Sequence, residues 1–549
     1  MKNHPVVDRV TFEAPHAGPW ELERVVFTRP LTRFIQESVT KALPRGLADG
    51  TARYGMLLSH VQLAAVNGFV YFRPVLHGMQ PEVSWPPTGM FLWLMLRLQP
   101  SLRARMQTCR RAFETKRWRA ELSLWDRVDR PLSIARNQAL QAEDPAALDT
   151  DGLITHLSWA RAHLEDMIEM HHRYDLAACL PMGDYLAHAC AWTGASPEEA
   201  LAALGEGSPG MGAVAPGELD ALVRVIEGCA EAQAWMNAGR IGSDGHAGSQ
   251  GRAGRDGRAG HAGHAGRDGH AGRARRAGSE ERARSDGGGS NDEGEDGKAW
   301  RILEGLASLS GEAGEAARRL LEGARFRSVG FDVCEATGGE QPGRLVRAIQ
   351  EALSALRNPE TAGERLGRER ALRERVPAEF RAQFDALLGE ARGMSRLRLE
   401  RGVYADQWAV GLARRALLEA GGRLVATGAL VKAEHAVELS VEELGALLQG
   451  RGGLSASEVE ARFRWRAEAS FEVAPAWLNM PLLPMPSDTS LPPCAQRLAR
   501  ATQALGCTAS VAREYGIPGM GRLGIEEAAP ACSREVRRSK PLGAMSAMV

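Results

Sequence analysis

Apolar residues recur three and four positions apart along most of this chain, which is the spacing of an amphipathic helix. The segment 146–174, AALDTDGLITHLSWARAHLEDMIEMHHRY, shows this pattern, with Asp149 or Asp151 placed to cap its start. Ser196 and Ser440 are each followed three residues later by glutamate, the capping-box arrangement that begins a helix. The pattern predicts a mainly α-helical, multi-helix fold.

One stretch near the N-terminus departs from this spacing. Residues 53–75, RYGMLLSHVQLAAVNGFVYFRPV, are interpreted as a helix that breaks at Asn67-Gly68. The aromatic and β-branched residues 69–75 that follow the break predict a strand. We therefore expect minor β structure near the N-terminus of the helical domain.

Changes in composition divide the chain into five parts. Residues 241–298 are rich in Gly, Ala, Arg, Asp and His and almost without large apolar residues, so they are predicted to be a disordered insertion. Residues 1–240 and 299–472 on either side predict one helical domain and its continuation. Residues 473–493 are rich in proline and predict an extended connector. The last part, 494–549, is too short for an ordinary α/β domain with its own core.

Charge and cysteine usage narrow the class of protein. Lys plus Arg and Asp plus Glu both number 68, which argues against a dedicated nucleic-acid or membrane-surface binder. The longest apolar stretch, 89–100, is too short to span a bilayer. The eight cysteines form no C-x-x-C pair, so neither a zinc site nor a disulfide framework is indicated. We expect a cytoplasmic protein that binds neither nucleic acid nor membrane.

The segment 163–194, HLEDMIEMHHRYDLAACLPMGDYLAHACAWTG, concentrates imidazole and carboxylate groups within a predicted helical region. The spacing is not H-E-x-x-H, so no metal site is predicted. The groups are interpreted either as a polar seam between helices, with histidines hydrogen bonded to carboxylates, or as contacts to a substrate. The substrate-binding candidates are His163, His171, His172, Asp184 and His188.

A second group is apolar. Trp85, Met90, Trp93 and Met95 could line a pocket for a large hydrophobic ligand. Core packing explains the same residues equally well.

The third group is a short cassette at 510–519, SVAREYGIPG. It resembles the segment that follows the active-site histidine in phosphoenolpyruvate-utilising enzymes, a family that includes phosphoenolpyruvate synthase, pyruvate phosphate dikinase and rifampicin phosphotransferase. In that family a histidine on a swivelling domain accepts a phosphoryl group as a nucleophile. The matching family-motif residues are Ala512, Arg513, Glu514, Gly516, Ile517 and Pro518. Most of residues 17–450 are also similar to the substrate-binding domain of rifampicin-phosphotransferase-like proteins.

The chain departs from the family pattern in two ways. Cys507 falls at the position of the family histidine and is the only candidate for its catalytic role. No Gly-rich phosphate loop or acidic metal cluster of an ATP-grasp domain is recognisable. We therefore expect 494–549 to be a truncated α/β remnant of the phosphohistidine domain, left by a deletion or a frameshift.

The resemblance implies phosphoryl transfer to an organic hydroxyl group, with ATP or phosphoenolpyruvate as donor and Mg²⁺ as cofactor. The chain is expected to retain the substrate-binding region and not to be catalytic alone. One alternative is a subunit of a split phosphotransferase, with the ATP-grasp and phosphohistidine domains supplied in trans by a partner protein. The other is a non-catalytic binding protein for a large apolar metabolite.

Overall fold

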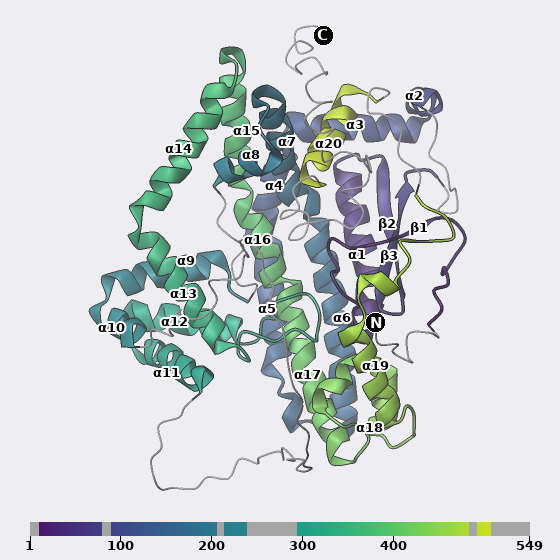
Figure 1. The fold of residues 1–549 in the computed structure, drawn as a ribbon, viewed down its shortest axis with the longest axis vertical. Coiled ribbons are helices and arrows are strands. Elements are labelled where there is room, and N and C mark those ends of the chain that lie inside the picture. Colours follow the sequence, from purple (N-terminus) through teal and green to yellow (C-terminus); the bar gives the residue numbers. More distant parts are fainter. Residues whose placement is uncertain (1–9, 80–88, 206–212, 239–293, 483–490, 507–549) are drawn as a thin grey trace, which may run out of the picture.

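The computed structural model describes residues 10–79, 89–205, 213–238, 294–482 and 491–506. These residues form a mainly helical structure with a small antiparallel sheet, as the sequence predicts (Figure 1). The helices of the main body are α1 (Arg33–Arg53), α2 (Gly89–Leu98), α3 (Pro100–Glu114), α4 (Arg117–Leu124), α5 (Arg130–Ala142), α6 (Thr150–Arg173), α7 (Asp175–Thr193), α8 (Pro197–Leu204), α14 (Pro359–Arg375), α15 (Arg381–Gly393), α16 (Ser395–Tyr404), α17 (Asp406–Ala426), α18 (Val441–Leu448), α19 (Ala456–Glu468) and α20 (Pro493–Gly506).

The sheet has the strand order β2-β3-β1-β4, from β1 (Trp20–Leu22), β2 (Leu58–Val66), β3 (Phe69–Leu76) and β4 (Trp477–Leu478). The prediction of a helix before Asn67 is wrong, because residues 58–66 are a strand paired with β3 in a hairpin. Asn67 and Gly68 both have positive φ, 52° and 86°, as a two-residue type I′ hairpin turn requires. The strand predicted over 69–75 is confirmed.

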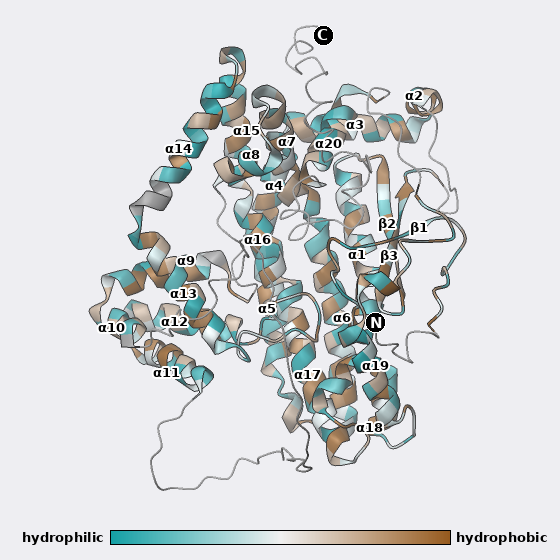
Figure 2. Ribbon diagram, viewed as in Figure 1, coloured by the Kyte–Doolittle hydropathy of each residue, from teal (hydrophilic) through white to brown (hydrophobic). Residues whose placement is uncertain are grey.

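Helix α1 lies between the sheet and α6 and packs against both (Figure 1). Its approach to α6 is close at Gly46, where an added methyl group would lie 2.3 Å from the carbonyl oxygen of Glu169. The largest apolar core combines α1 and the sheet with α6, α7 and α17. Helices α7 and α17 are buried on nearly all sides along much of their length, which places them at the centre of this core, and Figure 2 shows apolar and polar residues mixed along the helices around them.

A smaller helical bundle stands beside the main body, on the left in Figure 1. It consists of α9 (Pro216–Gly228), α10 (Ala230–Ala238), α11 (Glu295–Ser308), α12 (Gly311–Ala324) and α13 (Pro342–Arg357). The bundle has its own apolar core, which includes Ile226, Leu303 and Leu345. The predicted insertion separates α10 from α11. Most of it lies outside the described residues, but its last residues, from Glu295, belong to α11.

Arg327 connects this bundle to the main body. Its guanidinium group is almost fully buried, pairs with Glu218 of α9 at 2.7 Å, and lies 4.6 Å from the ring centre of Trp408 of α17. The backbone beside Arg327 can come this close to α17 because residue 411 is glycine. A methyl group on Gly411 would lie 1.8 Å from the carbonyl oxygen of Phe326. The bundle is therefore anchored on the central helix α17.

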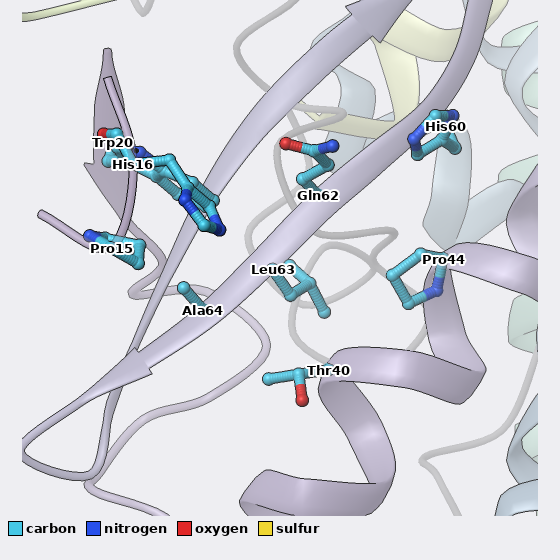
Figure 3. Close-up of a pocket in the computed structure, with 9 residues that line it drawn as sticks. All are labelled: Pro15, His16, Trp20, Thr40, Pro44, His60, Gln62, Leu63 and Ala64. Atoms are coloured by element: carbon cyan, nitrogen blue, oxygen red, sulfur yellow. Dashed lines mark hydrogen bonds between the residues drawn. The ribbon is translucent and has the colours of Figure 1, made fainter. Parts of the chain in front are cut away.

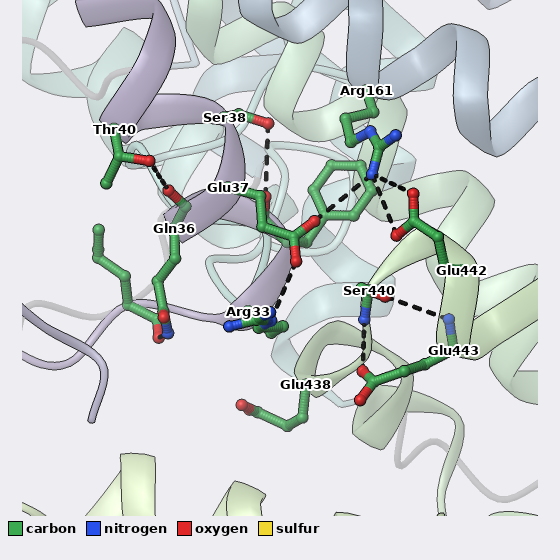
Figure 4. Close-up of polar contacts among 12 residues, drawn as sticks. Arg33, Gln36, Glu37, Ser38, Thr40, Arg161, Glu438, Ser440, Glu442 and Glu443 are labelled. Carbon is green, nitrogen blue, oxygen red and sulfur yellow. Dashed lines mark hydrogen bonds and ion pairs between the residues drawn. The ribbon is translucent and has the colours of Figure 1, made fainter. Parts of the chain in front are cut away.

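Polar contacts tie α1, α6 and α18 together (Figure 4). Arg161 of α6 reaches Glu37 of α1 at 3.4 Å and Glu442 of α18 at 3.0 Å. The capping box predicted at the start of α18 is confirmed: the backbone N–H of Glu443 donates to the Ser440 hydroxyl at 3.1 Å. Asp149 caps α6 in the same way, accepting from the N–H of Gly152 at 2.7 Å.

The C-terminal part of the described chain returns to the main body. Within the predicted connector, β4 pairs with β1 and completes the sheet. Helix α20 packs against α7 at Gly183, where a methyl group would lie 2.3 Å from the carbonyl oxygen of Ala501. Residues up to Gly506 thus belong to the helical body. The cassette that follows lies outside the described residues.

None of the helices in the described ranges combines the length and apolar character needed to cross a membrane.

Candidate functional site

The five residues predicted from the sequence as substrate-binding candidates lie on α6 and α7. These two helices are consecutive and meet at Tyr174. The structure brings His171 and His172 together but places them apart from Asp184 and His188. Asp175 and Asp184 are nine residues apart on α7, which corresponds to about 13 Å along a helix.

His171 and His172 lie where two pairs of helices meet. In the first pair, α6 ends in basic residues and α7 begins at Asp175. In the second, α16 carries Arg401 in its last turn and α17 begins at Asp406. Cationic groups at a helix C-terminus and carboxylates at an N-terminus both interact favourably with the helix dipole.

The two junctions are joined by buried polar contacts. Arg401 donates to the Asp175 carboxylate, and the side chains of this pair are only 1% and 2% exposed. His172 Nδ1 lies 2.8 Å from Asp175 Oδ2, and His171 Nδ1 lies 3.0 Å from Asp406 Oδ1. Arg401 and Asp406 were not predicted from the sequence, because their partners lie more than 200 residues away in the chain.

Burial and neighbouring charges shift the pKa values of the side chains in this cluster. Burial raises the pKa of Asp406 to about 7, against the opposing charges of His172 and Arg401. Burial and the charge of Arg401 hold the pKa of His171 well below its ordinary value. Burial also acts to raise the pKa of Asp175, but His172 and Arg401 outweigh it and the pKa is lowered. His171 is therefore neutral at pH 7, and Asp175 is ionised.

His171, His172 and Asp175 each offer one ligand atom, and these atoms lie within 4.8 Å of one another. A metal ion placed there would compete with the Arg401 guanidinium group for the Asp175 carboxylate. The contact between Arg401 and Asp175 already neutralises the buried carboxylate, as a buried charge requires. Ion pairing therefore accounts for the cluster.

Asp184 and His188 form a second cluster, with α20. Asp184 is fully buried and accepts two hydrogen bonds from Arg497, at 2.9 and 2.6 Å. His188 Nδ1 lies 2.8 Å from the Asp184 carbonyl oxygen. Burial acts to raise the pKa of Asp184, but the hydrogen bonds from His188 and Arg497 outweigh it and lower the pKa. This ion pair holds α20 on α7.

We expect D184N to destabilise the fold by about 2 kcal/mol at pH 7, because the amide no longer pairs with Arg497. Because the folded-state pKa of Asp184 is lowered, its contribution is present above the unfolded pKa, near 3.9, and is lost as the pH falls below it. Urea denaturation should therefore give a smaller difference between variant and wild type at pH 3.5 than at pH 7. An equal difference at both pH values would contradict this assignment.

His163 stands alone among the predicted residues. It is buried on α6, and its Nε2 lies 3.0 Å from Asn137 Oδ1 of α5. Burial and the charge of Arg136 lower the pKa of His163 to about 4, so the ring is neutral. Each of the five predicted residues therefore has a hydrogen-bond partner within the protein.

Three residues of the apolar group predicted from the sequence, Met90, Trp93 and Met95, lie on α2. Met90 is 82% exposed, and Trp93 is 43% exposed with the Arg97 guanidinium group 3.9 Å from its ring centre. Met95 is half-buried. Trp85, Cys507 and the cassette residues Ala512–Pro518 lie outside the described residues.

A cavity of about 370 Å³ lies along β2 and was not predicted from the sequence (Figure 3). Its wall is formed by the segment before β1, by β1, by one side of α1 and by β2. Gln62, Leu63 and Ala64 are neighbours on β2, so their side chains alternate between the two faces of the sheet. Because β2 is the outermost strand and all three residues line the cavity, the cavity wraps around its free edge.

The lining of this cavity combines an apolar surface with a few fixed polar groups. Trp20 is buried, and its Nε1 donates to the His16 carbonyl oxygen at 3.1 Å. The Arg73 guanidinium group lies 4.5 Å from the centre of the Trp20 ring and donates to Gln62 Oε1 at 2.6 Å. Burial lowers the pKa of His60, which favours the neutral ring. A neutral imidazole can both donate and accept a hydrogen bond.

The volume and the mostly apolar lining of this hollow fall within the range of small-molecule sites, and the hollow is open to solvent on one side. Ligand pockets are commonly 300–1,000 Å³, mostly apolar, with few polar groups that orient the ligand. The sequence analysis missed the cavity because residues 58–66 were predicted to be helical. In a strand, the alternation of His60, Gln62 and Ala64 would have indicated a shared face.

Comparison with known proteins does not assign this chain to a family. Neither the models of protein families nor the curated proteins contain a match to this chain.

Proposed function

We propose that this chain binds a small organic molecule in the cavity along β2, as the ligand-binding part of a phosphotransferase of the phosphoenolpyruvate-utilising type. The observation that carries the binding proposal is the cavity itself, with the Trp20 ring held by Arg73 and with His60 and Gln62 on its wall. Its volume is at the lower end of the range for ligand sites. This favours a compact molecule with an aromatic ring and one or two hydroxyl groups.

The phosphotransferase part of the proposal rests on the resemblance of the cassette 510–519 to the phosphohistidine segment of that family. Cys507 stands at the histidine position, so the phosphoryl group would be carried by domains supplied in trans. A partner with an ATP-grasp domain would use ATP and Mg²⁺ to phosphorylate the histidine of a phosphohistidine domain, and that histidine would pass the phosphoryl group to a hydroxyl of the bound molecule. Phosphoenolpyruvate is the alternative donor to the histidine. A cytoplasmic location fits this chemistry, and Cys109, Cys229, Cys334 and Cys494 of the described residues are free thiols.

A thermal-shift screen against hydroxylated mono- and bicyclic aromatic compounds tests the binding proposal. A compound that binds the folded state stabilises it by mass action, by roughly 2.7 kcal/mol at a hundredfold excess over its Kd. We expect a rise in melting temperature for wild type and for His77→Ala, a control histidine at the end of the hairpin. The rise should be reduced for His60→Ala. No shift across the library would contradict the proposal.

The transfer step has a separate test. ³²P-labelled ATP, an ATP-grasp protein and a phosphohistidine domain are mixed with this chain and a compound from the screen. We expect labelled compound only when all three proteins are present. Binding without any transfer would instead favour a non-catalytic binding protein, an alternative that fits the pairing of the α6 and α7 histidines within the protein.

A further inference from the structure

Helix α2 lies at the upper right edge of the molecule (Figure 1), and Figure 2 draws it largely in the brown of apolar residues. Leu92 and Leu96 face inward and join a small apolar cluster with α3 and α20. The rest of the helix surface carries five large apolar residues, each between 43% and 82% exposed: Met90, Phe91, Trp93, Leu94 and Leu98. Single exposed apolar residues are ordinary, whereas a cluster of them on one element marks a binding surface.

The charged residues beside this apolar surface are almost all arginines. Helices α2, α3 and α20 together hold one acidic residue, Glu114, and seven arginines: Arg97, Arg103, Arg105, Arg110, Arg111, Arg497 and Arg500. Within the described ranges, Arg110 pairs with Glu114, whereas the exposed Arg103 and Arg111 make no ion pair. The balanced charge of the whole chain, on which the expectation of no membrane contact rests, therefore does not describe this end of the molecule.

Arg97 places positive charge on the apolar face itself. Its guanidinium group lies 3.9 Å from the ring centre of Trp93, one turn earlier on the same face of α2. Tryptophan is enriched where acyl chains meet lipid headgroups, because its ring is apolar and its N–H is polar. Arginine has an apolar stem and a guanidinium group that binds phosphate through paired hydrogen bonds. The outer face of α2 therefore matches the boundary between acyl chains and phosphate groups.

We propose that α2 lies in the surface of a bilayer that contains anionic phospholipids. Met90, Leu94 and Leu98 enter the acyl region, and the arginines of α2 and α3 contact the phosphate groups. A helix of ten residues is about 15 Å long, half the thickness of the hydrocarbon core, so α2 lies along the surface and does not cross it. The cytoplasmic leaflet carries anionic lipids, which fits the proposed cytoplasmic location.

The same arginines argue against a second copy of this chain as the occupant of the surface. A two-fold contact through α2 brings the same patch of each copy together, so Arg97 and Arg103 face the equivalent arginines of the other copy. Like charges that face each other across an interface disfavour association. Anionic headgroups neutralise these charges instead.

Flotation of the full chain with lipid vesicles tests the proposal. Binding to phosphatidylcholine vesicles with about a third phosphatidylserine should be at least about tenfold stronger than binding to phosphatidylcholine alone, and it should weaken as the salt concentration rises. L94S/L98S should weaken binding at least about tenfold, because it removes apolar side chains from the outer face. R103Q/R111Q should weaken it roughly twentyfold, because two cationic groups near the headgroups are lost.

Matched variants on other helices control for the substitutions themselves. Leu356 of α13 and Leu366 of α14 are 50% and 54% exposed, so L356S/L366S is the control for the leucines. Arg344 and Arg347 are exposed on α13, and R344Q/R347Q is the control for the arginines. Neither control should change vesicle binding. All four double variants should keep the wild-type melting temperature, because the substituted side chains are exposed.

Three results would overturn the proposal: no binding of wild type to either kind of vesicle, equal binding to both kinds, or binding that the α2 and α3 variants leave unchanged. Analytical ultracentrifugation identifies the competing occupant. Self-association of wild type that L94S/L98S abolishes, without vesicle binding, would assign the surface to a second copy. The substituted residues do not line the cavity along β2, so the outcome is independent of the ligand-binding proposal.

Discussion

Replacing Arg401 with methionine should destabilise the folded chain by about 3–5 kcal/mol, because the substitution leaves the Asp175 carboxylate buried without its guanidinium partner. Both side chains are at most 2% exposed, so water cannot replace the lost contact. Arg401 also donates to the His171 carbonyl oxygen at 3.3 Å, so the junction of α6 and α7 loses a second contact. Urea denaturation at pH 7 measures the loss.

Two further variants make this expectation specific. The exposed pair of Arg110 and Glu114 provides the control, and R110M should change stability by less than about 1 kcal/mol. The double variant R401M/D175L removes both buried charges and should be more stable than R401M alone. If the double variant is instead as unstable as the sum of the two single variants, the charge pairing described here is not the source of the effect.

The second large effect is expected at adjacent glycines of α17. A methyl group on Gly421 would lie 2.1 Å from the carbonyl oxygen of Ala433, which is backbone and cannot rotate away. A methyl group on Gly422 meets nothing within 4 Å. G421A should therefore cost about 3 kcal/mol through overpacking. G422A should be neutral or stabilise by up to about 1 kcal/mol, because alanine favours a helix.

Thermal unfolding of the two variants, which have identical composition, measures this contrast. The difference depends on the packing of α17 against the segment Ala433–Glu438. Equal melting temperatures would show that α17 does not approach this segment as described.

The helices could be predicted from the sequence because their signals are local. Asp149 and Ser440 cap the helices that the apolar spacing indicates, and the structure confirms both. The error at 58–66 has a physical cause: the run LSHVQLAAV is compatible with a helix or a half-buried strand. The sequence analysis interpreted Asn67-Gly68 as a break in a helix, whereas these residues form the two-residue turn of a β-hairpin.

The candidate sites were harder to predict because their contacts join distant segments. The local group of His171, His172 and nearby carboxylates was recognised, yet its main partners are Arg401 and Asp406 of another helix pair. Asp406 is the first residue of α17, as Asp175 is the first residue of α7, and an acidic residue that begins a helix is a signal that could have drawn attention to it. The cavity lies along the edge strand β2. Because residues 58–66 were predicted to be helical, the sequence analysis did not find it.

Isothermal titration calorimetry of the best compound from the thermal-shift screen tests the central proposal most directly. The key variant is Ala64→Phe, which places a large side chain in the cavity from the surface of β2 and is checked for an unchanged fold by circular dichroism. We predict one-site binding to wild type and to His77→Ala, and at least a tenfold weaker affinity for Ala64→Phe. One-site binding to Ala64→Phe with the wild-type affinity would contradict a ligand site in this cavity.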